Sequence, residues 1–163
     1  MRLYLDCEWA DPEAKHLVSL ALIDSREQWR FYAEIDPLPE QPTEFVRDTV
    51  YPLLQRGFWA KDKRKFTLGL RNFLHRLKGS KRLILATHET DFALLREALA
   101  GFGEDIPGPI PEWTPILVTQ DDVLGHMAAY LSHNPDAAGR NHHAMVDANA
   151  LRWAFEHVIE GAM

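Results

Sequence analysis

The stretch from Arg82 to Ala100, RLILATHETDFALLREALA, decides the fold class. Its first part, Leu83 to Ala86, is apolar at every position and so lacks the alternation of a strand with one face in water. Such a run is expected in a strand that helices cover on both sides. Helical spacing of apolar residues follows from Asp91 to Ala100. The stretch therefore predicts a buried strand, from Arg82 to Thr87, followed by a helix, which is the building unit of α/β folds.

Three further strands are expected before this unit. Residues 2–9 alternate with period two, which places Leu3, Leu5, Cys7 and Trp9 on one face and Tyr4, Asp6 and Glu8 on the other. Two more apolar runs, 17–23 and 29–35, are separated by the turn-prone pair Asp24-Ser25. The three strands together predict an antiparallel meander.

The remaining elements are mostly helical. Apolar spacing predicts helices at 45–54, 66–77, 122–131 and 144–158, with a basic connector at 61–65, a Gly- and Pro-rich loop at 101–111 and a short strand at 116–119. This order predicts an α/β fold with a five-stranded mixed sheet flanked by helices, in which two parallel strands join the meander.

The bulk composition limits the class of protein. With 163 residues, 46% of them hydrophobic and 26% charged, the chain fits a single domain over residues 1–163. No apolar stretch reaches the roughly 18 residues of a membrane span and no leader pattern is present, so we expect a soluble cytoplasmic protein. The lone Cys7 excludes an internal disulfide. A net charge of -6 argues against coating long nucleic acid but allows binding of a strand end, since metal-holding carboxylates add negative charge.

Three acidic residues, Asp6, Glu8 and Asp91, are candidates for a catalytic or metal-binding role. Asp6 and Glu8 lie two apart on one strand, so their carboxylates point to the same side with Cα atoms roughly 7 Å apart. Such a pair suits Mg²⁺ or Mn²⁺, although the exposed polar face of an edge strand is the alternative. Asp91 follows the carboxyl end of the buried strand, where open α/β sheets bind ligands; its alternative role is to stabilise a helix dipole.

The last helix adds an acid and two histidines. Asp147 interrupts a stripe that is otherwise apolar, formed by Ala144, Leu151, Ala154 and Val158, so its carboxylate should face the sheet. A buried aspartate is rare unless it is paired or binds metal. His142 and His143 stand where a loop enters this helix; each is either polar surface or a residue suited to accept a proton near neutral pH.

Taken in order, these segments resemble the motifs of the DEDDh branch of the DnaQ-like 3′→5′ exonucleases, and most closely its small bacterial exoribonuclease group. Asp6-Cys7-Glu8-Trp9 resembles the first motif, residues 87–95 around Asp91 resemble the second, and the segment 142–148, HHAMVDA, resembles the third, His-x-Ala-x-x-Asp-Ala. The resemblance spans nearly the whole chain, and the 45–54 helix with Val46-Arg47 and Trp59 also look like that group.

This resemblance implies a ribonuclease-H-like fold and a metal-dependent 3′→5′ exoribonuclease. It implies that two divalent cations, Mg²⁺ or Mn²⁺, are held by the four carboxylates of Asp6, Glu8, Asp91 and Asp147, with His142 as general base. Two such ions can activate the attacking water and stabilise the leaving oxygen. The implied substrate is the 3′ end of single-stranded RNA, the product is a nucleoside monophosphate, and a homodimer is plausible.

Several interpretations stay open. Trp9 and Ala10 stand where many relatives have Thr and Gly, so Trp9 either stacks on the terminal base or caps the core. His88 lies before Asp91 and is expected to line the site or the surface, and the basic residues 61–65 either track phosphates or form a solvated loop.

Three competing functions also stay open. The chain could be a 3′→5′ exonuclease acting on DNA, or a non-catalytic module that binds nucleotides or RNA ends. The third alternative is a zinc site made of His126, His133, His142 and His143, for which the spacing is loose and no cysteine is at hand.

Overall fold

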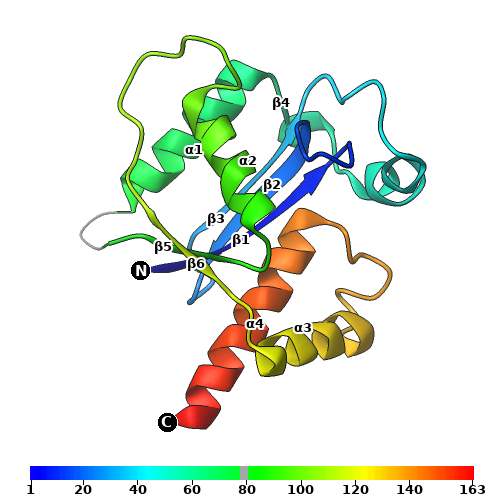
Figure 1. Ribbon diagram of the computed structural model, residues 1–163, viewed down its shortest axis with the longest axis vertical. Coiled ribbons are helices and arrows are strands. Elements are labelled where there is room, and N and C mark those ends of the chain that lie inside the picture. The colour runs from blue at the N-terminus through cyan, green and yellow to red at the C-terminus, as the bar shows by residue number, and fades with distance from the viewer. Residues whose placement is uncertain (78–80) are drawn as a thin grey trace.

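The computed structural model of the protein describes residues 1–77 and 81–163 and has one six-stranded mixed sheet flanked by helices (Figure 1). The strands are β1 (Arg2–Trp9), β2 (Leu17–Asp24), β3 (Arg30–Ile35), β4 (Ala60–Lys61), β5 (Leu83–Ala86) and β6 (Thr114–Leu117). The α-helices are α1 (Lys63–Arg76), α2 (Glu89–Ala100), α3 (Asp121–His133) and α4 (Ala144–Ala162). Three short helical turns, η1 (Val46–Val50), η2 (Tyr51–Leu53) and η3 (Gly57–Trp59), lie between β3 and β4. No described helix is both long and apolar enough to cross a membrane.

The strand order is β4-β3-β2-β1-β5-β6. β1, β2 and β3 pair antiparallel, and β5 and β6 continue the sheet parallel to β1, so the predicted meander and two parallel strands are confirmed. The predicted count of five strands is wrong. A sixth strand, β4, pairs in parallel with β3 through Glu34 opposite Ala60 and Ile35 opposite Lys61. Two residues are too few to show a period in the sequence, and their partner on β3 is distant in the chain.

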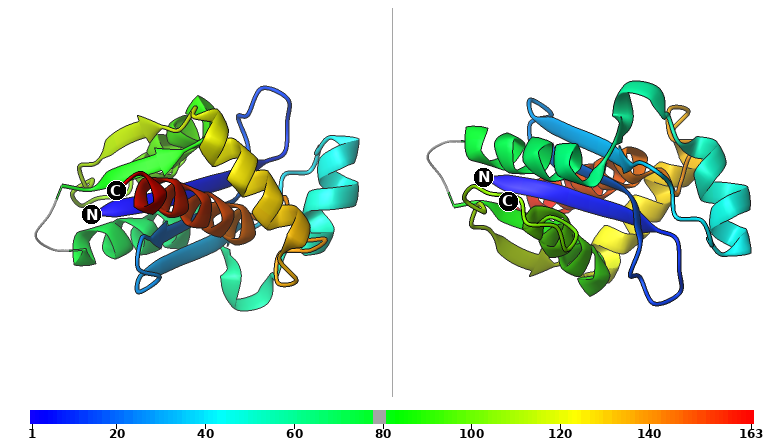
Figure 2. Two further views of the ribbon diagram at one scale, coloured as in Figure 1. Left: turned by 90° about the horizontal axis from the view of Figure 1, so that it is seen from below. Right: turned by 90° about the horizontal axis from the view of Figure 1, so that it is seen from above.

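Each face of the sheet is covered by its own helices, as the two views of Figure 2 show. Leu3, Leu5 and Cys7 of β1 belong to the core cluster that contains the apolar residues of α1 and α2. Tyr4 belongs to the opposite cluster, which is completed by α4. The alternation predicted for residues 2–9 is therefore confirmed. Because helices cover both faces of the sheet, every residue of β5 except its first is buried.

The apolar stripe of α4 packs on the sheet as predicted. Ala144, Leu151 and Ala154 are buried in the core cluster beside Tyr4, and Val158 packs against the same cluster. Asp147 lies in this stripe and is 8% exposed. The helix thereby carries one carboxylate into the space beside β1.

The segments before α1 depart from the sequence expectations. The predicted 45–54 helix is confirmed in position, since residues 44–53 are helical, but it consists mainly of the π-helix η1 and the 3-10 turn η2, in which Pro52 lacks the N–H that a longer helix needs. The predicted basic connector 61–65 is wrong. Lys61 is in β4, and α1 begins at Lys63 because the Asp62 carboxylate accepts a hydrogen bond from the backbone N–H of Lys65 at 2.8 Å.

The last strand is displaced from its predicted position. β6 occupies 114–117 rather than 116–119, and the backbone N–H of Thr114 donates to the carbonyl of Arg82 at 2.8 Å. Pro115 is tolerated inside this strand because β6 is at the edge of the sheet, where one side needs no ladder hydrogen bonds.

Candidate functional site

One pocket of about 700 Å³ is lined by all the acidic residues that the sequence singled out, together with one of the two histidines. Asp6 and Glu8 come from the end of β1, Asp91 from the start of α2, and Asp147 and the preceding His142 from the start of α4. The parallel connection β1–β5 brings the end of β5, and hence α2, next to the end of β1. The topology thus assembles three segments that are far apart in the chain.

The carboxylates of Asp6 and Glu8 do not lie on an edge strand. β1 lies between β2 and β5 in the sheet; its pairing with β5 ends at Tyr4, and beyond it the N–H of Cys7 donates to Asp91 of α2. Both side chains are half-buried on the face that α4 covers. The Oδ2 atom of Asp6 is buried and has no hydrogen-bond partner.

Asp91 is 1% exposed and joins α2 to β1. Its Oδ1 atom accepts a hydrogen bond from the backbone N–H of Cys7 at 3.0 Å. Its Oδ2 atom is buried without a hydrogen-bond partner, and the Nδ1 atom of His88 lies 3.9 Å away. A carboxylate that served only the helix dipole of α2 would need no such burial, so the dipole alone does not account for it.

Asp147 and His142 are linked by their own backbone turn. The Oδ2 atom of Asp147 accepts a hydrogen bond from the backbone N–H of His142 at 2.8 Å, while its Oδ1 atom is buried without a partner. His142 has a φ of 72°, a left-handed conformation that is uncommon outside glycine. One ligand atom each of Glu8, His142 and Asp147 lies within 4.8 Å of the other two.

Burial raises the pKa of all four carboxyl groups, and repulsion by neighbouring carboxylates adds to the shift in Asp6, Glu8 and Asp91. Burial, followed by the charges of Asp147 and Asp91, raises the pKa of Glu8 to about 8. Burial likewise raises the pKa of Asp91 to about 7 and that of Asp147 to about 6, although backbone N–H groups oppose the shift in both. The pKa of Asp6 is raised well above its usual range by burial and then by its three acidic neighbours. Among the described residues no lysine or arginine forms an ion pair with any of the four.

This donor set fits divalent cations. Three buried carboxylate oxygens, one each from Asp6, Asp91 and Asp147, lack any partner, and a buried carboxylate is costly unless a cation or a hydrogen bond neutralises it. Hard oxygen ligands are the ones that Mg²⁺ and Mn²⁺ prefer. Glu8 and Asp147, together with His142, have ligand atoms within 4.8 Å of one another, and Asp6 and Asp91 line the same pocket.

The structure also shows the positions of Trp9 and His88. Trp9 is half-buried and packs against the core cluster under α1 and α2, as the core interpretation predicts; it also lines the carboxylate pocket, and stacking on a base stays a prediction. His88 is the N-cap residue of α2 and lines the same pocket with an exposed side chain.

His143 does not share the site of His142. It is 3% exposed, its ring stacks on Tyr32 with centroids 4.8 Å apart, and it lines a different pocket. The proposed histidine zinc site does not form either. Within residues 1–77 and 81–163, the one group of three or more potential ligands is Glu8, His142 and Asp147, which includes neither His126 nor His133. The basic residues 63–65 surround a separate surface pocket with Glu104.

Phe45 is a site residue that sequence reasoning missed. It is 52% exposed, lines the carboxylate pocket and meets the His142 ring edge-on with centroids 5.0 Å apart. An exposed aromatic residue in a helical pattern carries no sequence signal that separates it from the core.

No family model and no curated protein matches the chain.

Proposed function

We propose that the protein is a divalent-cation-dependent 3′→5′ exoribonuclease of the DEDDh type with a ribonuclease-H-like fold. The observation that carries the proposal is the convergence of four carboxylates beside His142, with three buried oxygen atoms that have no partner. Such an arrangement is costly for a protein without cations, and it is the ligand set that two-metal phosphodiester hydrolysis uses.

Asp6, Glu8, Asp91 and Asp147 are the residues that would hold the cations. When bound, two divalent ions supply the positive charge that stabilises the attacking and leaving oxygens at phosphorus. The protein contributes rigidity to this site. Asp91 is fixed by the N–H of Cys7 and Asp147 by the N–H of His142, so two of the four carboxylates are oriented before any ligand binds.

His142 is the general base in this proposal. Its ring lies at the pocket beside Glu8 and Asp147, and the edge-on contact with Phe45 restricts its orientation. The imidazole takes a proton from the attacking water as the new phosphorus–oxygen bond forms. The bond between phosphorus and the 3′ oxygen of the preceding nucleotide breaks, that oxygen acquires a proton, and a nucleoside 5′-monophosphate leaves.

The pocket walls favour the end of a single strand. Next to the carboxylates the lining is apolar and partly aromatic, with Trp9, Phe45, Val46 and Leu131 among its residues. A flat base can stack on such side chains irrespective of sequence, which contributes roughly 1–3 kcal/mol per base in single-strand binders. RNA is proposed over DNA because of the resemblance to the exoribonuclease group, and a homodimer is proposed on the same ground.

The test compares 5′-labelled RNA and DNA oligomers of one sequence in Mg²⁺, in Mn²⁺ and in EDTA. We expect the RNA to shorten by single nucleotides, faster than the DNA, and EDTA to abolish the reaction. Full activity in excess chelator would exclude the metal site, and early fragments of intermediate length would show an endonuclease. Faster loss of DNA would assign the DNA alternative, while binding of RNA ends without products would assign the non-catalytic module.

A further inference from the structure

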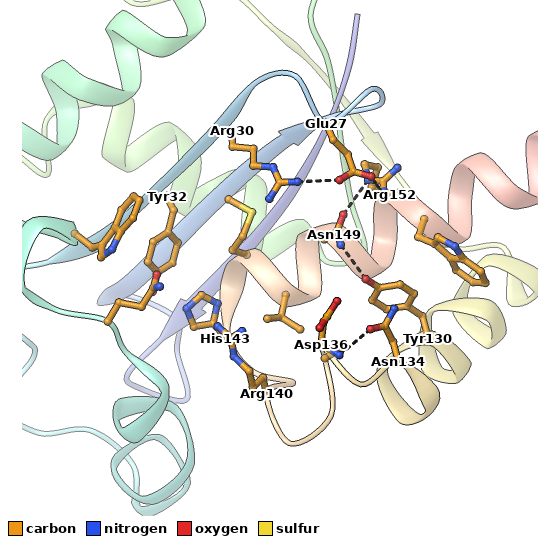
Figure 3. Close-up of a pocket in the computed structure, with 16 residues that line it drawn as sticks. Glu27, Arg30, Tyr32, Tyr130, Asn134, Asp136, Arg140, His143, Asn149 and Arg152 are labelled. Atoms are coloured by element: carbon orange, nitrogen blue, oxygen red, sulfur yellow. Dashed lines mark hydrogen bonds and ion pairs between the residues drawn. The ribbon is translucent and has the colours of Figure 1, made fainter.

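A second pocket, of about 680 Å³, is lined by residues of α3, of α4 and of the loop between them, together with residues of β3 and η3 (Figure 3). We call it the Tyr32 pocket; the residues that matter here are Tyr32, Trp59, Arg140, His143, Asn149 and Trp153. They come from β3, η3, the loop before α4, and α4 itself. None of them belongs to the carboxylate pocket.

The two pockets adjoin each other. His142 lines the carboxylate pocket and His143 lines the Tyr32 pocket, so a single peptide unit separates them. The register of the sheet also indicates that the two pockets are neighbours. Asp6 pairs with Ala21, and Ala21 pairs with Tyr32, so these residues form one row across three neighbouring strands. Two strand spacings amount to about 10 Å, which is the separation expected between the backbones at Asp6 and Tyr32.

Aromatic rings stand at both ends of the Tyr32 pocket. Trp59 is 36% exposed and lies tilted against Tyr32 with ring centroids 5.6 Å apart. At the far end Trp153 is also 36% exposed and lies 5.3 Å from the ring of Tyr130. Trp153 is already stacked on the His157 ring, with centroids 5.2 Å apart and 4° between the ring planes, so Trp59 is the ring that offers its exposed part to a base.

The middle of the pocket is polar and retains an available cation. Glu27 forms ion pairs with Arg30 at 2.8 Å and with Arg152 at 2.5 Å, so these three charges are already engaged. Arg140 is exposed and, within the described part of the chain, forms no ion pair. Asn149 adds an amide, which donates to the hydroxyl of Tyr130 at 2.9 Å.

His143 is the second indication that a ligand binds here. Figure 3 shows it between Tyr32 and Arg140 on the wall of the pocket. Both of its ring nitrogens are buried without a hydrogen-bond partner. Leaving a polar group in this state is unfavourable, and a polar ligand that reaches these nitrogens would remove the cost.

We propose that the Tyr32 pocket binds the RNA strand on the 5′ side of the nucleotide being removed, with a base stacked on Trp59 and a phosphate at Arg140. The inference rests on the proposed exonuclease function and extends it to longer substrates. Proteins that bind single strands combine exposed aromatic faces with cations that follow the backbone. A strand whose 3′ end lies among the carboxylates passes the 142–143 peptide and reaches this pocket.

The test measures binding and turnover of an eight-nucleotide RNA and of a dinucleotide. Binding is followed by fluorescence anisotropy with Mg²⁺ in an Asp147→Asn background, which removes turnover. We expect Arg140→Ala and Trp59→Ala each to weaken binding of the eight-nucleotide RNA by about tenfold, whereas dinucleotide binding changes less than twofold. Trp59→Phe, which keeps a smaller ring, should have an intermediate effect and guards against misfolding of the alanine variant.

Arg96→Ala is the matched control. Arg96 is an exposed arginine that stacks on Trp113 beside Lys81 and Arg82, at the end of β5 opposite to the carboxylates. Arg96→Ala should change the binding of neither the eight-nucleotide RNA nor the dinucleotide. Equal weakening of both RNAs by Arg140→Ala, or equal affinity of the wild-type pocket for both lengths, would overturn the proposal. A change of oligomeric state in the Trp59 and Arg140 variants would make the pocket an interface between copies and overturn it as well.

The two proposals fail in different ways. If RNA of any length is bound but never shortened, the exonuclease function fails while the length dependence of binding still reports on the Tyr32 pocket. If RNA is shortened but Arg140→Ala leaves the KM of the eight-nucleotide substrate unchanged, only the assignment of the pocket is wrong.

Discussion

Asp147 offers the sharpest separation between function and stability. Asp147→Asn keeps an oxygen that accepts the N–H of His142, but it removes one negative charge from a buried cluster whose members repel one another. We expect hydrolysis to fall to background, with the melting temperature of the metal-free protein unchanged or higher. Asp6→Asn should behave in the same way.

Asp121→Asn, on an exposed residue of α3, is the control for the loss of one charge and should change neither property. A markedly lower melting temperature of metal-free Asp147→Asn would mean that Asp147 is a structural partner in the core. Thermal unfolding in EDTA and hydrolysis in Mg²⁺ measure the two properties separately.

The adjacent histidines should respond differently to alanine. His142→Ala removes the proposed base and should lower turnover by roughly 10²- to 10⁴-fold, while the four carboxylates still bind cations. His143→Ala removes a buried ring that stacks on Tyr32, so it should mainly lower the free energy of unfolding, by roughly 0.5–3 kcal/mol. Single-turnover hydrolysis of a dinucleotide and urea unfolding distinguish the two. If only the His143 variant lost turnover, the assignment of the general base to His142 would be wrong.

Between helices and loops, Arg71 of α1 holds the 101–111 loop in place through hydrogen bonds. Its side chain is 4% exposed and donates to the carbonyls of Leu99 at 2.8 Å, Ile106 at 2.9 Å and Pro107 at 3.2 Å. Arg71→Leu leaves these carbonyls without their donor, and hydrogen bonds to charged groups contribute about 1.5–3 kcal/mol each.

We therefore expect Arg71→Leu to lower the free energy of unfolding by at least about 2 kcal/mol and to expose the loop to proteases. Arg64→Leu, on the exposed side of the same helix, should have little effect. The site carboxylates make no contact with Arg71, so the KM of the surviving folded protein should be unchanged. If Arg71→Leu were as stable as the wild type, water would have replaced the guanidinium as the hydrogen-bond donor to these carbonyls.

For the whole molecule, the carboxylate cluster links stability to pH and to cations. The pKa values of Asp147, Asp91 and Glu8, about 6, 7 and 8, lie above the values near 4 of unfolded chains. Groups whose folded pKa is raised contribute stability that is fully present below about pH 4 and is lost as the pH rises through about 6 to 8.

In EDTA, the stability advantage of Asp147→Asn over the wild type should therefore grow from pH 4 to pH 8. Mg²⁺ added at pH 8 should raise the melting temperature of the wild type, because a ligand at 100 times its Kd stabilises by about 2.7 kcal/mol. Thermal unfolding across pH, with and without Mg²⁺, checks both effects. If Mg²⁺ at pH 8 left the melting temperature of the wild type unchanged, the proposed metal site would be contradicted.

Much of the architecture was determined by the sequence alone, because it depends on local periodicity. The alternation of residues 2–9 decides which side chains of β1 face each layer of helices, and the stripe of α4 requires Asp147 to point inward. The candidate ligands Asp6, Glu8 and Asp91 followed from strand geometry and from the position after a parallel strand, and the structure brings them together in one pocket.

Only the tertiary structure decided the features that depend on distant partners or on a single backbone angle. The sixth strand exists because Ala60 meets Glu34 across the sheet, and two residues carry no period. Local periodicity treats His142 and His143 alike, and in the sequence only the motif resemblance favoured His142. The left-handed turn at His142 and the stacking of His143 on Tyr32 place the two rings in different pockets, which periodicity does not encode.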